Sequence, residues 1–512
     1  MTHSLHSLKS FFSKCALPAA LIALSLNVYA GKKDDTLVYA SDSEVENISP
    51  YHNHMREGVI IAHLAWDTLV HRDPQTNEYK PQLATGWKWE SPSALVLNLR
   101  RGVKFHNGDA FTADDVVFTF DVVGPGKESI QQQSFIWIDK TEKIDDYTVR
   151  LRLKKPFPAA LEYLSGPMPI YPAKYFQKVS LSGYSKAPVG TGPYRITAIT
   201  PAQGVTMEKN PDYFKESPLG QPRIGKLKFV VISDPESRVA QLMTGQVDWI
   251  WRVSADQAAA LKTLPNLTVK SGETMRVGFI QISPNVPGAE GTPFKDLRVR
   301  QAVNHAINRA GMAENLVRGG SRPVWSACYD GQVACDTRDV VRYDYNPEKA
   351  KKLLAEAGYP NGFDTGLWAY RERDYAEAII GDLRKVGIRA RLHFVKLPVM
   401  DADQRSGKAP MGIRTWGSLG INDASAFTAP FFGGKGNDLW RDAEVVATLN
   451  KADETVDPKQ RSELYAKALG RISTQAMSAP LFTYSINYAY SADLNFDAWP
   501  DELPRFYMSS WK

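Results

Sequence analysis

In two separate segments of the chain, the spacing of hydrophobic residues is first typical of a strand, then of a helix, and then of a strand again. In the first stretch, residues 226–232 alternate polar and apolar side chains, residues 235–243 repeat apolar ones at helical spacing, and residues 247–251 return to a strand pattern. Asp234 and Pro235 are typical of an N-cap and a first helical turn. This order predicts a βαβ unit.

A second stretch repeats this order. Residues 365–370 and 388–394 have strand patterns, and residues 376–386 between them carry an apolar helical stripe that ends before Gly387. Further helices are predicted over residues 297–309, over residues 348–357 and from Pro458 onward. Two βαβ units in a chain of this length predict two α/β lobes, and open α/β sheets bind ligands at the carboxyl ends of their strands. We therefore expect a ligand cleft between the lobes.

Side chains that close or follow the predicted strands are the first candidates to face this cleft. Residues 36–40 read as a further strand that ends in a polar segment. For the aromatic side chains, packing in a core is the alternative role. The candidates are Ser41, Asp42, Glu44, Trp251, Arg252, Trp368 and Tyr370.

The first thirty residues have the pattern of a secretory signal peptide. Lys9 and Lys14 form a basic head, an apolar run covers residues 15–28, and small or modest side chains lead up to Ala30. The run is too short to cross about 30 Å of hydrocarbon. Cys15 opens the run instead of following it, which is the wrong place for a lipid anchor. We expect residues 1–30 to be removed and the mature protein to reside in an exported, oxidising compartment.

Composition narrows the function classes. The chain has 512 residues, of which 43% are hydrophobic and 11% aromatic, enough for large cores in more than one domain. Its formal net charge is +6 and no long block of Lys or Arg is present, which disfavours a nucleic-acid partner. Cys328 and Cys335 enclose a short loop containing Gly331. In an oxidising compartment this spacing favours a disulfide over a zinc site.

An enzyme is the competing class. The sequence contains no H-E-x-x-H motif and no phosphate-binding loop, and residues 416–420 lack the first glycine of a nucleophile elbow. We therefore predict no catalytic residue, no metal site and no cofactor, and keep a secreted hydrolase only as the alternative from another class.

Several segments together resemble one family. Residues 97–120, LNLRRGVKFHNGDAFTADDVVFTF, combine a strand, a glycine turn and a helix capped by Thr112. They are similar to the signature of the bacterial extracellular solute-binding proteins of the peptide- and nickel-binding family, family 5. Other marks of that family occur in order at residues 81–84 with Trp87, 189–194, 210–214, 294–302, 349–354 and 357–360.

The resemblance implies a large, peptide-binding-like, type II periplasmic binding protein with two α/β lobes and an extra subdomain. Lobe I would comprise residues 31–75, 188–275 and 481–512, the inserted subdomain residues 76–187, and lobe II residues 276–480. Such a protein is a monomer that closes on a small solute. It delivers the solute to ABC permease subunits in the inner membrane, which are driven by cytoplasmic ATPase subunits.

The resemblance also bears on ligand choice. Peptide-binding relatives carry a Trp followed three positions later by an Asp that pairs with the ligand's ammonium group; here Trp416 is followed by Leu419. Asp423, next to Asn422, either replaces that acid or caps the next segment. Arg414 either pairs a ligand carboxylate or lies at the surface. The expected ligand is a peptide or peptide-like solute, with a non-peptide nutrient such as an opine, a sugar or a metal chelate as the alternative.

Overall fold

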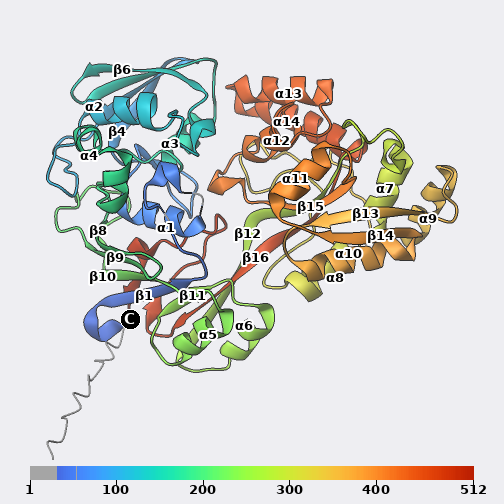
Figure 1. Cartoon of the computed structure of the whole chain (residues 1–512). Coiled ribbons are helices and arrows are strands. Elements are labelled where there is room, and N and C mark those ends of the chain that lie inside the picture. The colour runs from blue at the N-terminus through green and yellow to red at the C-terminus, as the bar shows by residue number, and fades with distance from the viewer. Residues whose placement is uncertain (1–30, 46, 54) are drawn as a thin grey trace, which may run out of the picture.

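The computed structural model describes residues 31–45, 47–53 and 55–512, so the predicted signal peptide lies outside the described residues. The chain forms two lobes that share one long mixed sheet (Figure 1). The order of its strands is β14 (Ile388–Phe394), β13 (Phe363–Ala369), β15 (Met411–Trp416), β12 (Leu267–Ile282), β16 (Ser478–Ser491), β11 (Trp249–Trp251), β1 (Thr36–Ser41), β10 (Lys226–Val231), β9 (Gly204–Lys209) and β8 (Tyr194–Thr200).

The central strand of lobe I, β1, is buried on both faces. Along β1, Leu37 and Tyr39 belong to one hydrophobic cluster, whereas Val38 and Ala40 belong to another on the opposite face. Helices α5 (Pro235–Met243) and α6 (Ala255–Leu261) cover the second face. β10 and β11 both pair with β1 in parallel, so the first predicted βαβ unit is confirmed as β10–α5–β11.

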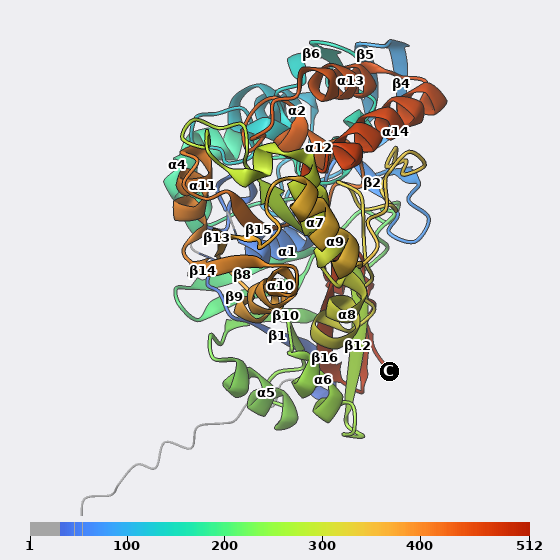
Figure 2. The same cartoon turned by 90° about the vertical axis from the view of Figure 1, so that its right-hand side faces the viewer.

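Lobe II is layered in the same way. Along β12, Ile280 and Ile282 pack against the cluster of α7, α9 and α10, whereas Val277 and Phe279 pack against that of α12 and α14. β13 and β14 pair in parallel around α10, which confirms the second βαβ unit. Figure 2 shows α7 and α9 side by side. The helices are α7 (Leu297–Ala306), α8 (Arg309–Met312), α9 (Pro347–Glu356), α10 (Arg373–Lys385), α11 (Leu397–Arg405), α12 (Ser425–Phe432), α13 (Ala443–Glu454) and α14 (Pro458–Thr474).

The two longest strands connect the lobes. The first half of β12 pairs with the second half of β16, and the second half of β12 pairs with the first half of β16, so both strands run from one lobe into the other (Figure 1). Their register shifts between Glu273 and Val277. An interrupted ladder is easier to bend than a regular one, which suits a hinge. The domain boundaries expected from the sequence remain predictions.

A separate four-stranded sheet lies beside lobe I. Its strands run in the order β4 (Ala84–Ser91), β5 (Ala94–Leu99), β7 (Thr148–Leu153) and β6 (Ile138–Asp145). Thr112 and Asp115 form the capping box of α2, as the sequence predicts. The neighbouring elements are α1 (Arg56–Ala65), β2 (Val70–Arg72), β3 (Tyr79–Pro81), α2 (Ala113–Phe118), α3 (Ala160–Ser165) and α4 (Ala173–Lys186), and near the C-terminus β17 (Leu494–Asn495) pairs with β18 (Ser510–Trp511). In the part of the chain described, no helix has the length and apolar character needed to cross a bilayer.

Candidate ligand-binding cleft

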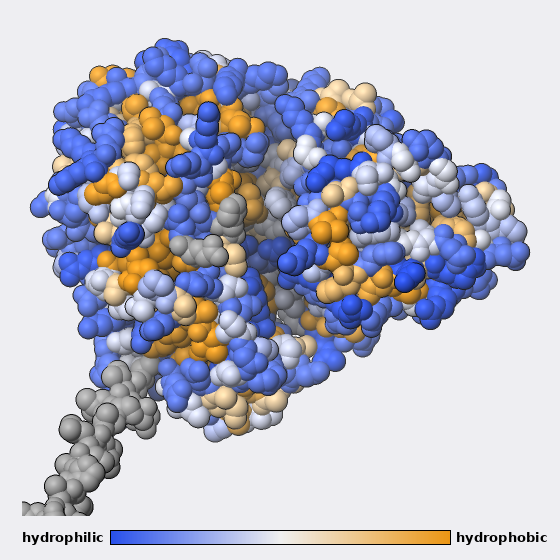
Figure 3. All heavy atoms as spheres, in the orientation of Figure 1, coloured by the Kyte–Doolittle hydropathy of each residue, from blue (hydrophilic) through white to orange (hydrophobic). Residues whose placement is uncertain are grey.

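A cavity of about 310 Å³ lies where the two lobes face each other. The molecular surface is hollowed along the boundary between the lobes (Figure 3). We call residues 419–421 the lobe II wall of this cavity. The lobe I side includes residues of α1, β2 and α3, the residue after β11, and residues of the C-terminal segment. They include Arg56, Val59, Ala62, His63, His71, Arg72, Glu162, Ser165, Arg252, Asp501, Leu503, Arg505 and Tyr507.

Helix α1 contributes to the cavity because its two faces differ. Arg56, Val59 and Ala62 are spaced three apart and therefore share one face, which lines the cavity. Ile60 and Ile61 point to the other side and are buried in the lobe I core. The amphipathic spacing of the helix thus places a guanidinium group at the cavity while the opposite face anchors the helix.

Arginine is the main source of charge in the cavity. Among the described residues that line it are five arginines but only two carboxylates, Glu162 and Asp501. Arg56 from α1 and Arg276 from β12 both pair with a third carboxylate, Glu502, at 3.1 Å and 2.7 Å. Burial raises the pKa of Glu502, but the charges of Arg276 and then Arg56 outweigh burial and lower it to about 2. Two cations sharing one anion leave this side of the cavity positive.

A second ionic group joins β2, α3 and the C-terminal segment. Arg72 lies 3.1 Å from Glu162 and 3.7 Å from Asp501, and Asp501 also pairs with Arg505 at 2.5 Å. Burial raises the pKa of Asp501, but Arg505 and then Arg72 hold it well below its ordinary range. The two arginines and two carboxylates of this group balance one another.

Two histidines of the cavity carry no charge at neutral pH. Enclosure away from water lowers the pKa of His63 to about 4 and that of His71 to about 3, and the charge of Arg505 acts in the same direction. The positive character of the cavity therefore comes from guanidinium groups, which bind carboxylates in a bidentate geometry.

The strand-end candidates of lobe I lie behind the cavity wall. The indole of Trp251 donates to Ser41 Oγ (2.8 Å), which donates to Glu57 Oε1 (2.5 Å). Arg252, which lines the cavity, lies 3.7 Å from Glu57 and 3.5 Å from Asp42. These side chains form a connected layer beneath Arg252. The exposed Glu44 lies apart, accepting a hydrogen bond from the amide of Ala202 (2.6 Å).

The structure places the lobe II candidates away from the cavity lining. Trp368 stacks on His393, with ring centroids 4.0 Å apart, and the adjacent half-buried Tyr370 packs against the same small cluster. Arg414 is buried and donates to Gln404 Oε1 (2.7 Å), while the indole of Trp416 donates to the carbonyl of Ala426 (2.7 Å). Their predicted contact with a ligand remains a prediction.

Asn422 and Asp423 adjoin the lobe II wall. The amide of Asn422 donates to Glu162 Oε1 across the lobe boundary (2.7 Å). Asp423 is buried and forms a bidentate ion pair with Arg461 of α14 (2.7 and 2.8 Å), and it accepts a hydrogen bond from the amide of Ser425 (3.0 Å). Both of its oxygens have partners within lobe II, which favours capping over the alternative of an ammonium contact.

Sequence reasoning missed most of the cavity lining. Of the strand-end candidates only Arg252 lines the cavity, and Leu419, which the sequence singled out for a different reason, lines it too. The other candidates, Ser41, Asp42, Glu44, Trp251, Trp368, Tyr370, Arg414, Trp416, Asn422 and Asp423, are not among its lining residues. The missed residues include Arg56, Arg72 and Arg276. Arg56 and Arg276 each follow a methionine and Arg72 lies between His71 and Asp73, and none of these contexts differs from that of an ordinary surface arginine.

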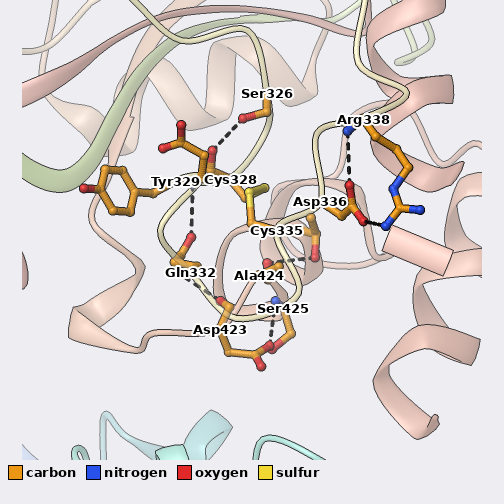
Figure 4. The surroundings of a disulfide bond; sticks show 12 residues. Ser326, Cys328, Tyr329, Gln332, Cys335, Asp336, Arg338, Asp423, Ala424 and Ser425 are labelled. Atoms are coloured by element: carbon orange, nitrogen blue, oxygen red, sulfur yellow. Dashed lines mark hydrogen bonds and ion pairs between the residues drawn. A yellow bond between two sulfur atoms is a disulfide. The ribbon is translucent and has the colours of Figure 1, made fainter. Parts of the chain in front are cut away.

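Cys328 and Cys335 are joined by a disulfide bond (Figure 4). We call residues 328–335 the disulfide loop. Cys328 is fully buried in the lobe II core, in the cluster that contains residues of α12, α13 and α14.

Comparison with known proteins identifies the family. Residues 78–438 match the bacterial extracellular solute-binding proteins, family 5. The glutathione-binding protein GsiB of Pectobacterium atrosepticum is 30% identical over 440 residues, which cover 80% of this chain and 81% of that relative. The solved structure of HbpA2 from Haemophilus parasuis is 25% identical with a TM-score of 0.79, covering 93% of this chain and 100% of that one. A dipeptide-binding protein of Pseudoalteromonas sp. SM9913, solved with Met-Leu, is also 25% identical, with a TM-score of 0.77 over 93% of this chain and 100% of that one. The chain therefore belongs to family 5 of the bacterial extracellular solute-binding proteins.

Proposed function

We propose that the protein is the periplasmic substrate-binding component of an ABC importer, and that it captures a peptide or peptide-like solute through a carboxylate group. The observation that carries this proposal is the arrangement of Arg56 and Arg276, which face the cavity and share the single anion Glu502. A ligand carboxylate entering there gains charge-assisted hydrogen bonds that the protein alone leaves incomplete.

In this proposal, ligand binding drives the two lobes to close, and closure prepares the protein for delivery of the ligand. Arg56 belongs to lobe I, Arg276 lies on the strand that leads into lobe II, and Leu419 belongs to lobe II. A ligand that contacts all three binds the closed arrangement more tightly than an open one. It therefore shifts the population toward closure by that difference in affinity. The closed form would then be the one that the permease recognises.

Two relatives support a peptide-like ligand. GsiB is named for glutathione and the Pseudoalteromonas protein was solved with Met-Leu, and both compounds carry carboxylates. Leu419 favours the second candidate, a non-peptide solute such as an opine. A leucine at this position of the wall offers no carboxylate to pair with the ammonium group of a peptide.

A thermal-shift screen tests the proposal. The panel contains Met-Leu, Met-Leu amide, reduced glutathione, the opine octopine, glucose and nickel–histidine. A ligand at about a hundredfold over its Kd adds about 2.7 kcal/mol to stability. We expect a carboxylate ligand to raise the Tm and its amide to lose most of that effect. Stabilisation by glucose alone, or by Met-Leu and its amide equally, would contradict the carboxylate proposal.

Two further parts of the proposal have direct tests. Intact-mass measurement on periplasmic extract should give a chain that begins within two residues of Gly31 and carries no lipid, and light scattering should give a monomer. A ligand incubated with the protein should be recovered unchanged by chromatography. Its hydrolysis would favour the hydrolase alternative.

A further inference from the structure

The disulfide loop lies against the segment that carries the lobe II wall. The side-chain amide of Gln332 donates to the carbonyl of Ile421 (2.9 Å) and to that of Asp423 (3.2 Å). The backbone of Val333 pairs in parallel with the same segment: its amide donates to the carbonyl of Asn422 (3.2 Å), and its carbonyl accepts from the amide of Ala424 (2.9 Å). Four hydrogen bonds thus join two adjacent residues of the disulfide loop, Gln332 and Val333, to residues 421–424.

Gln332 is itself fixed by the loop. It is 4% exposed, and its Oε1 accepts a hydrogen bond from the amide of Tyr329 (3.1 Å), next to Cys328 (Figure 4). The disulfide closes the loop around this side chain. Because an unrestrained eight-residue loop samples many conformations, the bond reduces the freedom of the donor that Gln332 presents to the wall.

The supported segment meets the cavity on its other side. Leu419, Gly420 and Ile421 line the cavity. The carbonyl of Gly420 accepts a hydrogen bond from Arg72 of β2 (3.3 Å), and the amide of Asn422 donates to Glu162 of α3 (2.7 Å); both partners lie on the lobe I side of the cavity. The same few residues therefore form one side of the ligand site and two contacts between the lobes.

We infer that the disulfide loop supports the lobe II wall and that Gln332 is a positioning residue for ligand binding. The loop holds residues 421–424 through the hydrogen bonds of Gln332 and Val333. This fixes where Leu419 to Ile421 stand in the cavity and where Asn422 meets lobe I. Reduction of the disulfide should weaken ligand binding indirectly, through the position of the wall, because neither sulfur contacts the ligand. The affinity part of this inference rests on the proposed function, whereas the support of the wall does not.

Hydrogen–deuterium exchange without ligand tests the support. In Gln332→Glu, which is close in shape but lacks the amide donor, and in the Cys328→Ser/Cys335→Ser protein, peptides covering residues 419–424 should exchange about tenfold faster. Those covering β10 in lobe I should not change. Arg338→Ala is the control, since Arg338 follows the disulfide loop and pairs only with the neighbouring Asp336 among the described residues. Unchanged exchange at residues 419–424, or an equal rise throughout lobe II, would overturn the inference.

Affinity provides a readout that general destabilisation would not reproduce. With the panel compound that shifts the Tm of the wild type, calorimetry should give a severalfold higher Kd for Gln332→Glu and for the cysteine double variant. Combining the changes should add little, because both act through the same hydrogen bonds. Gln332→Asn is a second variant in case Gln332→Glu does not fold. Fully additive effects or an unchanged Kd would reject the positioning role. Silence of the whole panel would count against the proposed function, while the exchange result would still decide the support of the wall.

Discussion

Leu419 lies in the lobe II wall with 57% of its surface exposed and a left-handed backbone (φ 55°). A leucine with this backbone angle is uncommon, whereas Asp and Asn adopt it more readily. The position therefore accepts a polar side chain without a cost in backbone strain, and it offers a matched pair of substitutions.

We predict that Leu419→Asp weakens binding of a carboxylate ligand without an ammonium group by at least tenfold, because it adds a like charge beside the ligand. Binding of a ligand with a free ammonium group should improve. Leu419→Asn is the control, because it has nearly the same shape and no charge. Titration calorimetry with N-acetyl-Met-Leu, which has a carboxylate but no ammonium group, and with Met-Leu, which has both, measures the two effects separately. Equal affinities for the Asp and Asn variants would show that charge at this position does not select the ligand.

The ion pairs of Glu502 predict how the stability of the fold depends on pH. Its folded-state pKa of about 2 lies below the ordinary value of 4.5, so its ion pairs stabilise the fold above pH 4.5. That contribution is lost as the pH falls from about 4.5 to about 2. The shift corresponds to roughly 3 kcal/mol. Urea unfolding should show Glu502→Gln less stable than wild type at pH 7, and the gap should shrink at pH 3. Glu90→Gln, which changes an exposed partner of Arg150, should show a small gap at both values. A gap for Glu502→Gln that does not change with pH would contradict the assignment.

At the scale of secondary-structure elements, the Asp423–Arg461 ion pair joins the wall segment to α14. Both side chains are nearly inaccessible, at 3% and 5% exposed. Removing one partner of such a pair leaves an uncompensated buried charge, whereas replacing both removes two charges together.

Asp423→Ala should therefore lower the free energy of unfolding by about 3–5 kcal/mol. The double change Asp423→Leu/Arg461→Leu should cost less than the single one. Chemical denaturation measures both, and Glu444→Ala, which removes a half-exposed partner of Arg471, serves as the control. Full stability of Asp423→Ala together with lost ligand affinity would instead support a direct ammonium contact.

Several elements were predictable because their signals are local. The Asn346–Pro347 pair begins α9, with Asn346 Oδ1 accepting from the amide of Lys349 (2.9 Å), and Asp457 caps α14 in the same way. A cap needs only residues one turn apart, so the sequence contains all of it. Trp251 illustrates the opposite case. It ends a strand, which is a position where open α/β sheets often bind ligands. However, β11 lies between β16 and β1 in the middle of the sheet, and the indole of Trp251 packs in the core.

At the scale of the whole molecule, the hydrogen bonds between Arg72 and Gly420 and between Glu162 and Asn422 hold the lobes in their relative position. A third contact, Lys155 with Glu454 (2.6 Å), lies at the exposed rim. Buried contacts of this kind cost more to lose than an exposed ion pair, which water screens.

We predict that Glu162→Ala opens the lobes, because Asn422 and Arg72 then lose a shared partner. Small-angle X-ray scattering on the ligand-free protein should show a larger radius of gyration. Glu454→Ala, which removes the exposed contact, should leave the radius unchanged. An unaltered radius for Glu162→Ala would mean that other contacts hold the lobes together.

The sequence by itself determined the two βαβ units, the helix caps and the family, and it favoured a disulfide between the two cysteines. Each depends on residues close together in the chain or on motifs read as continuous segments. The ligand cavity was decided only by the tertiary structure. Arg56, Arg276 and Glu502 come from α1, a strand between the lobes and the C-terminal segment, more than 200 residues apart from one to the next. A hydrophobic pattern shows that a side chain lies at a surface, but which charges meet across a cleft depends on how the lobes pack.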